Sequence, residues 1–395
     1  MREKRTARNG KIELMRFVFS VLIILYHCHR TLGFDEWVIG SWHIPAMGGG
    51  RLGPDFFFLV SGLLMGRSIW KERQSDGNAE NAGTEKQDLT GGQIADERSE
   101  GMDGRFDLGR KTLHYFLKKY LAIFPYHLIC FTALFVLRLY SREIWDDTGD
   151  VFTFLLDSMP EFFLLQKFGF PTVDINIVEW YLSAMLIAIL LLYPIAYRYY
   201  SMFVRVIAPL LAFWLLGTMT YCLGTFSDQD LWLGIGQAGL FRAIAEMSLG
   251  MSAFELSRYV AGLHLSEPAR DLLTGAEAFG FILTVGYMLF GAAAKDEIQI
   301  LLFLAVSIML TFSEQTRGND LFRQPWILWL GRMNLSFYLS QLLGLNIVRL
   351  WITTPPMAVR CGLVLVITML CALAVQYAGN CLKSRMGDLR GAFQK

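Results

Sequence analysis

Two ionisable side chains in the first apolar segment have types and a spacing that suit chemistry. Arg16 and His27 lie eleven residues apart in the stretch RFVFSVLIILYHCHR. Eleven residues make about three helical turns, so both side chains share one helical face, roughly 16 Å apart along the axis. An imidazole exchanges a proton near neutral pH, and a guanidinium binds phosphates and carboxylates. Because such groups are costly at membrane depth, their presence suggests function.

Structural roles are also open to both residues. Arg16 could extend to the cytoplasmic headgroups, and His27 could hydrogen-bond to a neighbouring helix. A metal site is the weaker interpretation, because His27 and His29 diverge on a helix and no Cys or carboxylate set with ligand spacing accompanies them. We therefore expect no bound metal.

The composition predicts that these residues belong to an all-α polytopic membrane protein. Of the 395 residues, 54% are hydrophobic and 18% are charged, whereas about a quarter of the residues of a soluble domain are charged. Apolar runs of about 20 residues recur along the chain and predict a bundle of about ten transmembrane helices. A shorter apolar segment, 151–170, is expected to be interfacial or re-entrant. The predicted spans are 12–32, 54–70, 115–140, 177–199, 206–225, 236–256, 273–294, 298–314, 326–350 and 357–381.

Basic residues predict the orientation of this bundle in the cell membrane. The tail MREKRTARNGK holds five Lys and Arg residues, and the positive-inside rule places it in the cytoplasm. An even number of spans returns the C-terminus to the same side. We expect one multi-pass membrane domain over residues 1–395. The polar segment 71–110, between the second and third spans, is expected to be a flexible cytoplasmic loop.

Four further motifs follow the first helix in a fixed order. They are GGGRLGPDFFFLVSGLLMGRS (48–68), YFLKKYLAIFPYHL (115–128), EWYLSAMLIAILLLYP (179–194) and WLGRMNLSFYLSQLL (329–343). In that order they resemble the membrane-embedded acyltransferase-3 family, whose first helix carries an Arg, ten residues and then a His. The residues that match the family's patterns are Arg16, His27, Gly53, Asp55, Phe57, Phe58, Ser61, Gly62, Lys118, Lys119, Phe124, Pro125, Leu330, Gly331, Tyr338 and Leu339.

The chain departs from the family's patterns at several positions. Ala122 stands where the family often has a second Arg, and Met185 stands where it often has a Glu. Gln341 replaces a frequent His, and Asn334–Leu335 replaces a Ser–Tyr pair. These changes leave the Arg16–His27 pair intact, but they weaken any inference about the acceptor.

The resemblance implies an enzyme that transfers groups other than amino-acyl groups. Such a protein moves an acyl group, usually acetyl, from a coenzyme A thioester to a hydroxyl of an extracytoplasmic carbohydrate or lipid-linked sugar, and so modifies polysaccharides of the cell envelope. Acyl-CoA would be the co-substrate, and no nucleic acid is expected as a partner. Two alternatives are a secondary transporter and a catalytically inactive family member.

The resemblance also implies roles for individual residues. His27 would be the base that accepts the acceptor's hydroxyl proton. Arg16, Lys118 and Lys119 would meet the donor's phosphates at the cytoplasmic face, with the pantetheine arm lying along the first helix.

Three more residues are candidates for the outer part of the site. Asp55 would orient His27 or bind an acceptor hydroxyl, or else, as a carboxylate at a helix start, it would meet the helix dipole. Glu179 and Trp180 begin the fourth helix on the outer side and would bind the acceptor sugar. Arg242 and Glu246, one turn apart in the sixth span, are predicted to form an intramembrane ion pair.

Overall fold

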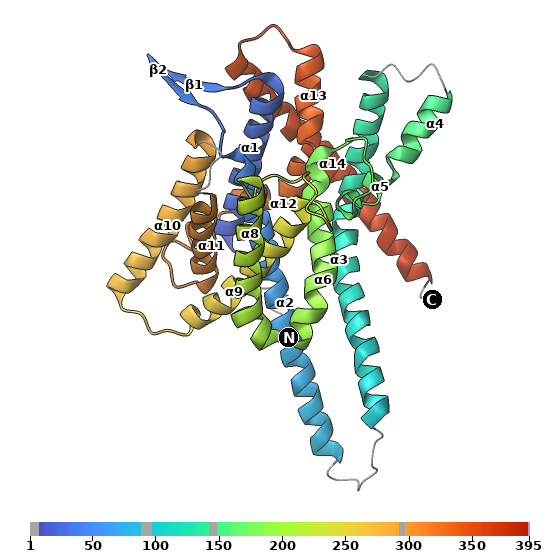
Figure 1. The fold of residues 1–395 in the computed structure, drawn as a ribbon, viewed down its shortest axis with the longest axis vertical. Coiled ribbons are helices and arrows are strands. Elements are labelled where there is room, and N and C mark those ends of the chain that lie inside the picture. The colour runs from blue at the N-terminus through green and yellow to red at the C-terminus, as the bar shows by residue number, and fades with distance from the viewer. Residues whose placement is uncertain (1–7, 88–96, 142–147, 292–296, 394–395) are drawn as a thin grey trace.

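The computed structural model describes residues 8–87, 97–141, 148–291 and 297–393, and most of these residues are helical (Figure 1). A two-stranded antiparallel hairpin, β1 (Glu36–Ile39) and β2 (Trp42–Pro45), pairs Glu36 with Pro45 and Ile39 with Trp42. The larger helices are α1 (Gly10–Leu32), α2 (Gly53–Gln87), α3 (Glu97–Ser141), α6 (Trp180–Arg198), α8 (Ala208–Leu223), α9 (Ala238–Ala261), α10 (Glu267–Phe290), α11 (Glu297–Ser313), α12 (Pro325–Leu339), α13 (Gln341–Trp351) and α14 (Met357–Phe393).

Shorter helical elements connect these helices. Four of them are single turns that precede or continue a long helix: η1 (Gly50–Leu52), η4 (Ile177–Glu179), α7 (Tyr200–Met202) and the π-helical η5 (Phe203–Ile207). The segment 151–170 falls within α4 (Thr148–Asp157), α5 (Met159–Phe162) and η3 (Gln166–Phe168) and the turns between them. Each of these helices is much shorter than the roughly 20 residues that a membrane crossing requires.

Helices occupy all ten ranges in which we predicted spans, which confirms the all-α fold. Among the described residues, seven helices are long and apolar enough to cross a membrane by length and composition. The three other ranges differ for identifiable reasons. Helix α9 carries charged residues, α11 has only 17 residues, and the single helix expected at 326–350 is divided at Ser340 into α12 and α13.

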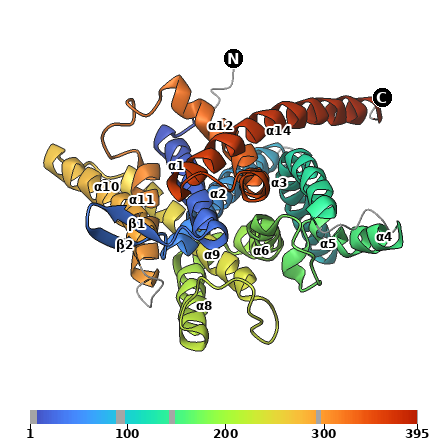
Figure 2. The same ribbon diagram turned by 90° about the horizontal axis from the view of Figure 1, so that it is seen from above.

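Helix α1 lies in the middle of the bundle, with α10 and α11 on one side and α3 and α6 on the other (Figure 2). Two polar contacts hold its first turn. The Asn9 side chain accepts hydrogen bonds from the backbone N–H groups of Lys11 and Ile12, as an N-cap residue does. The buried Lys11 ammonium lies 2.7 Å from a Glu277 carboxylate oxygen on α10. These contacts cap the start of α1 and join it to α10.

The polar segment 71–110 is largely helical where the structure describes it, whereas we expected a flexible loop. Helix α2 continues to Gln87 and α3 begins at Glu97, while residues 88–96 lie outside the described ranges. The two extensions project from the lower end of the bundle (Figure 1). The Lys111 ammonium joins them, 2.7 Å from an Asp76 carboxylate oxygen. Glu, Lys, Gln and Ala are good helix formers, so the helices persist beyond their apolar parts.

Candidate active site

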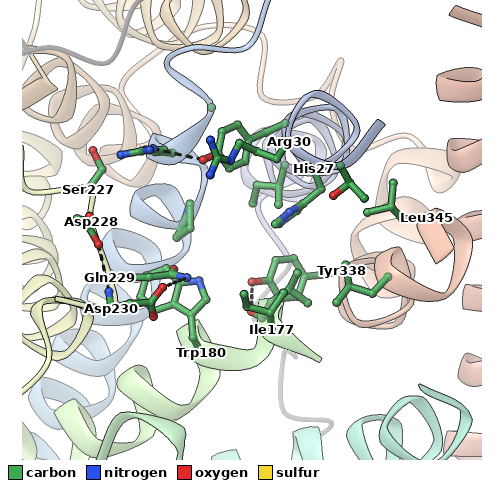
Figure 3. Close-up of a pocket in the computed structure, with 18 of the residues that line it drawn as sticks. His27, Arg30, Ile177, Trp180, Ser227, Asp228, Gln229, Asp230, Tyr338 and Leu345 are labelled. Atoms are coloured by element: carbon green, nitrogen blue, oxygen red, sulfur yellow. Dashed lines mark hydrogen bonds between the residues drawn. The ribbon is translucent and has the colours of Figure 1, made fainter. Parts of the chain in front are cut away.

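A cavity of about 460 Å³ lies at the end of the bundle that carries the β hairpin. Its wall comes from the last turns of α1, the starts of α2 and α6, the loop before α9, and helices α12 and α13. Its size is typical of a small-molecule site. Figure 3 shows His27 and Tyr338 on one side of it and Ser227, Asp228 and Gln229 on the other. Under the predicted orientation, this end of the bundle is the extracytoplasmic end.

His27 presents its imidazole to this cavity. The residue is half-buried, and the Tyr26 ring lies beside it with 5.6 Å between ring centroids. No described residue forms a hydrogen bond with either ring nitrogen of His27. His29 differs, because its Nδ1 lies 2.9 Å from the carbonyl oxygen of Phe34 and 3.2 Å from an Asp35 carboxylate oxygen. The two imidazoles therefore diverge as the sequence predicted, and His27 is the one left open to a ligand.

Trp180 forms another part of the cavity wall. Its ring lies 5.8 Å from the Arg242 guanidinium and 5.6 Å from the Lys167 ammonium. The Tyr338 hydroxyl donates to the carbonyl oxygen of Val178 at 2.6 Å and so ties α12 to the start of α6. An aromatic face supported in this way can stack on an apolar face of a ligand.

Glu179 lies behind the cavity wall, although we expected it at the acceptor site. Its carboxylate is fully buried, and one oxygen lies 2.9 Å from Nδ1 of His127, which is also fully buried. The Asn176 amide donates to the same oxygen at 2.9 Å, and Nε2 of His127 donates to the carbonyl oxygen of Phe162. Glu179 and His127 thus join α6 to α3. The sequence had suggested no role for His127.

The chain that leads to this wall is held by a second carboxylate, Glu161. Its two oxygens accept four backbone N–H bonds, from residues 173 to 176. Burial raises the pKa of the Glu161 carboxyl above its usual value, and the four donors partly offset this effect because they favour the charged form. The anchored segment delivers Ile177, Val178 and Trp180 to the cavity.

Asp55 belongs to a buried charge cluster rather than to the surroundings of His27. Arg242 donates hydrogen bonds to Asp55 and, at 2.9 Å, to Glu246, and all three side chains are at most 1% exposed. The predicted Arg242–Glu246 ion pair is thereby confirmed, with Asp55 as its third member. Arg242 also donates to the carbonyl oxygens of Ser227 and Arg51. The cluster therefore fixes two segments of the cavity edge.

The basic residues expected to meet the donor lie away from the cavity. The Arg16 guanidinium lies 3.3 Å from a carboxylate oxygen of Glu13. Lys119 is half-buried with its ammonium 5.5 Å from the centre of the Tyr115 ring, and Lys118 is exposed. The structure therefore separates the seven predicted site residues into three groups. His27 and Trp180 line the cavity, and Asp55 and Glu179 are buried in ion pairs. The three basic residues lie nearer the start of α1.

The face of α1 between Arg16 and His27 is covered by α12. The Ser20 hydroxyl donates to the Asn334 side-chain oxygen at 2.9 Å. The Phe17 ring stacks on Phe337 with 5.1 Å between centroids. We call these four residues the α1–α12 seal. These contacts place α12 against the part of α1 along which we expected the pantetheine arm.

Several cavity residues were missed at the level of sequence. Four such residues that line the cavity are Arg30, Asp228, Asn346 and Arg349. A usable signal was present. Arg30 and Arg349 lie near the ends of apolar helices on the side where the positive-inside rule predicts few basic residues.

Comparison with known families decides the classification. A family model described as an acyltransferase domain, acyltransferase-3, matches residues 9–377. The chain belongs to the acyltransferase-3 family. This confirms the resemblance seen in the motifs and identifies a membrane acyltransferase that acts on groups other than amino-acyl groups. No curated protein and no solved structure matches the chain.

Proposed function

We propose that this acyltransferase-3 protein moves an acyl group, most simply acetyl, from cytoplasmic acyl-CoA to a hydroxyl of a cell-surface or lipid-linked carbohydrate. The observation that carries the proposal is the cavity at the predicted outer end of the bundle, into which His27 presents an imidazole without a protein partner. An acceptor hydroxyl bound in this cavity can reach a ring nitrogen directly.

The reaction requires one proton to move twice. The hydroxyl oxygen attacks the thioester carbonyl carbon while His27 takes the hydroxyl proton. When the tetrahedral intermediate collapses, the carbon–sulfur bond breaks and the coenzyme A thiolate leaves. The imidazolium then returns the proton to that sulfur, so His27 ends the cycle as it began. General base catalysis of this kind typically contributes about 10² to 10⁴ in rate.

The other cavity walls suit a carbohydrate. Trp180 offers an aromatic face, while Gln229 and Asn346 offer amides that both donate and accept hydrogen bonds. A sugar ring needs both kinds of contact, because its C–H faces are apolar and its hydroxyls are polar.

The donor would approach from the opposite end of α1. Coenzyme A carries several phosphate charges and is confined to the cytoplasm, where Lys118, Lys119 and Arg16 supply positive charge. Its thioester reaches His27 only when the α1–α12 seal opens, so we propose that donor binding displaces α12 from α1.

Mass spectrometry of surface glycans tests this function. Cells would carry native protein, His27→Ala, His29→Ala or no gene, with membrane levels of the three proteins matched. We expect an ester mass with native protein and with His29→Ala, and a loss of at least 100-fold with His27→Ala. An ester that persists in His27→Ala would refute the assigned base. If no strain differs from the gene deletion, the transporter and the inactive family member become the better explanations.

A further inference from the structure

Three arginines that line the cavity have no acidic partner among the residues that the structure describes. Arg30, Arg51 and Arg349 all line the cavity. The Nε atom of Arg51 donates to the Tyr26 hydroxyl at 3.3 Å. Within the described ranges, none of the three guanidinium groups forms an ion pair with a carboxylate. Arg30 and Arg349 are also exposed, so their donors are available to a ligand.

The other charges of the cavity are largely neutralised by protein. Arg242 is bound by Asp55 and Glu246. The Asp230 carboxylate lies 2.8 Å from the Lys167 ammonium. Asp228 accepts only a backbone N–H, from Asp230, in the part of the chain that the structure describes. Arg138 also lines the cavity and donates to the carbonyl oxygen of Asp174. Apart from it, three guanidinium groups face one uncompensated carboxylate, and the cavity has a net positive charge.

This charge is unusual for its location. The positive-inside rule depletes Lys and Arg from extracytoplasmic segments, yet these arginines gather around one cavity at the predicted outer end. Guanidinium groups match the planar, bidentate geometry of carboxylates and phosphates.

We propose that the acceptor is anionic, with a carboxylate or phosphate group that Arg30, Arg51 and Arg349 bind next to the hydroxyl to be acylated. The proposal rests on the function proposed above and narrows its substrate class. Arg30 follows His27 by three residues on α1, so the two side chains lie about 5–6 Å apart at their Cβ atoms. An anion held by Arg30 therefore places hydroxyls of the same or the adjoining sugar within reach of His27.

Binding measurements on the purified protein test the charge of the acceptor without requiring turnover. The protein would be held in nanodiscs of uncharged lipid, with glucuronate, glucose 1-phosphate and glucose as probes. The native protein, the double variant R30Q/R349Q and the control R198Q would be compared. Arg198 is an exposed arginine near the end of α6, away from the cavity, so R198Q removes charge without altering the site.

We expect the native protein and R198Q to bind one or both anionic probes at least tenfold more tightly than glucose. The double variant should lose about tenfold or more of that affinity, because charged hydrogen bonds are lost. The anionic probe that binds more tightly identifies the charged group of the acceptor, a carboxylate for glucuronate or a phosphate for glucose 1-phosphate. Equal weak binding of all three probes, or anion binding that is unchanged in R30Q/R349Q, would overturn the proposal.

Two controls separate this inference from the donor site and from the proposed function. Coenzyme A should bind R30Q/R349Q as it binds native protein; a large loss would place the donor in this cavity and overturn the proposal. His27→Ala should bind the anionic probes normally while it fails to acylate glycans. Suppose that no strain forms a glycan ester, but that anion binding still depends on the arginines. The proposed acyl transfer would then be refuted, whereas the anion-binding site would be confirmed.

Discussion

At the scale of single residues, His27 and Trp180 form a pair with separable roles. His27 has an imidazole open to the cavity, and the aromatic ring of Trp180 borders the same cavity with the Arg242 and Lys167 side chains close to it. Under the proposed function, the imidazole exchanges a proton and the indole provides contact area for the acceptor. Substitutions at the two positions should therefore affect different kinetic constants.

Trp180→Ala should raise the KM for the acceptor about tenfold and leave the KM for acyl-CoA unchanged, because the ring borders the cavity proposed for the acceptor. Trp180→Phe should restore most of the affinity, since it retains an aromatic face. Steady-state transfer to a glycan acceptor, measured with each substrate varied in turn, would check this. A fall in kcat with unchanged acceptor KM would instead indicate a role in the chemical step.

The sequence predicted that His27 and Trp180 belong to the site, but it did not predict the ion-pair partners of Asp55 and Glu179. The spacing of Arg16 and His27 and the position of Trp180 at a helix start are local features, so the sequence displays them. Asp55 and Glu179 were expected at the site, yet Asp55 binds Arg242 and Glu179 binds His127. Those pairs join residues that are 187 and 52 positions apart, respectively. Only the packing of helices determines such pairs.

At the scale of elements, α2 and α9 approach closely through glycines. A Cβ atom on Gly62 would overlap the backbone carbonyl of Met247, and one on Gly250 would overlap the carbonyl of Leu59. Small residues permit this spacing between membrane helices. The close contact of these helices brings Asp55 on α2 next to Arg242 on α9. Arg242 in turn binds two backbone carbonyls at the edge of the cavity.

Gly62→Ala should lower the free energy of unfolding by about 2 kcal/mol, because the added methyl group forces two backbones apart. Gly66→Ala, one turn later on α2, is the matched control. Its Cβ would lie 3.4 Å from the Cα of Met251, an ordinary contact. Thermal unfolding of both variants in detergent would compare them. Equal melting temperatures would contradict the close packing of α2 and α9.

The buried His127–Glu179 pair between α3 and α6 gives a second prediction at this scale. His127→Leu should cost about 3–5 kcal/mol of stability, because Glu179 would be left charged and buried without its partner. The double change His127→Leu/Glu179→Leu should recover part of that loss. His114→Leu, at an exposed position of α3, should change the melting temperature little. A double variant no better than the single one would show that Glu179 has other sufficient partners.

Hydropathy predicted the positions of most helices, but it failed at one helix break and in one polar segment. The division of 326–350 at Ser340 was not predicted, because the hydropathy of WLGRMNLSFYLSQLL continues across it. The helical extensions in 71–110 were not predicted either, since low apolarity there suggested a loop. Hydropathy reports whether a segment is buried in lipid, and it reports helix breaks and solvated helices poorly.

At the scale of the whole molecule, the hairpin and the loop between α11 and α12 lie at opposite ends of the bundle. The hairpin follows the end of α1, while Thr316 in that loop accepts a hydrogen bond from Lys11 at the start of α1. The two ends of α1 thus mark the two opposite ends of the bundle, which face opposite sides of the membrane in the predicted orientation. This arrangement makes the predicted orientation directly measurable.

Val38→Cys and Asp320→Cys should react with a membrane-impermeant maleimide on opposite sides of the membrane. Val38 is 62% exposed in the hairpin, and the Asp320 side chain is 95% exposed in the loop. Both changes would be made in Cys222→Ser/Cys381→Ser protein, because these native thiols are exposed. We expect Val38→Cys to be labelled in intact cells, and Asp320→Cys only after permeabilisation. The reverse pattern would place the cavity in the cytoplasm.

The α1–α12 seal has a consequence beyond catalysis. An enzyme of the proposed kind receives one substrate from each face of a membrane, and that membrane must stay electrically insulating while it works. A passage always wide enough for a pantetheine arm would also conduct water and protons and would discharge the cell's proton gradient. The stacked Phe17 and Phe337 rings and the Ser20–Asn334 hydrogen bond close that passage at rest. Under the proposed function, the arm that opens the seal would also have to fill it, so the bound donor would itself block leakage during each transfer.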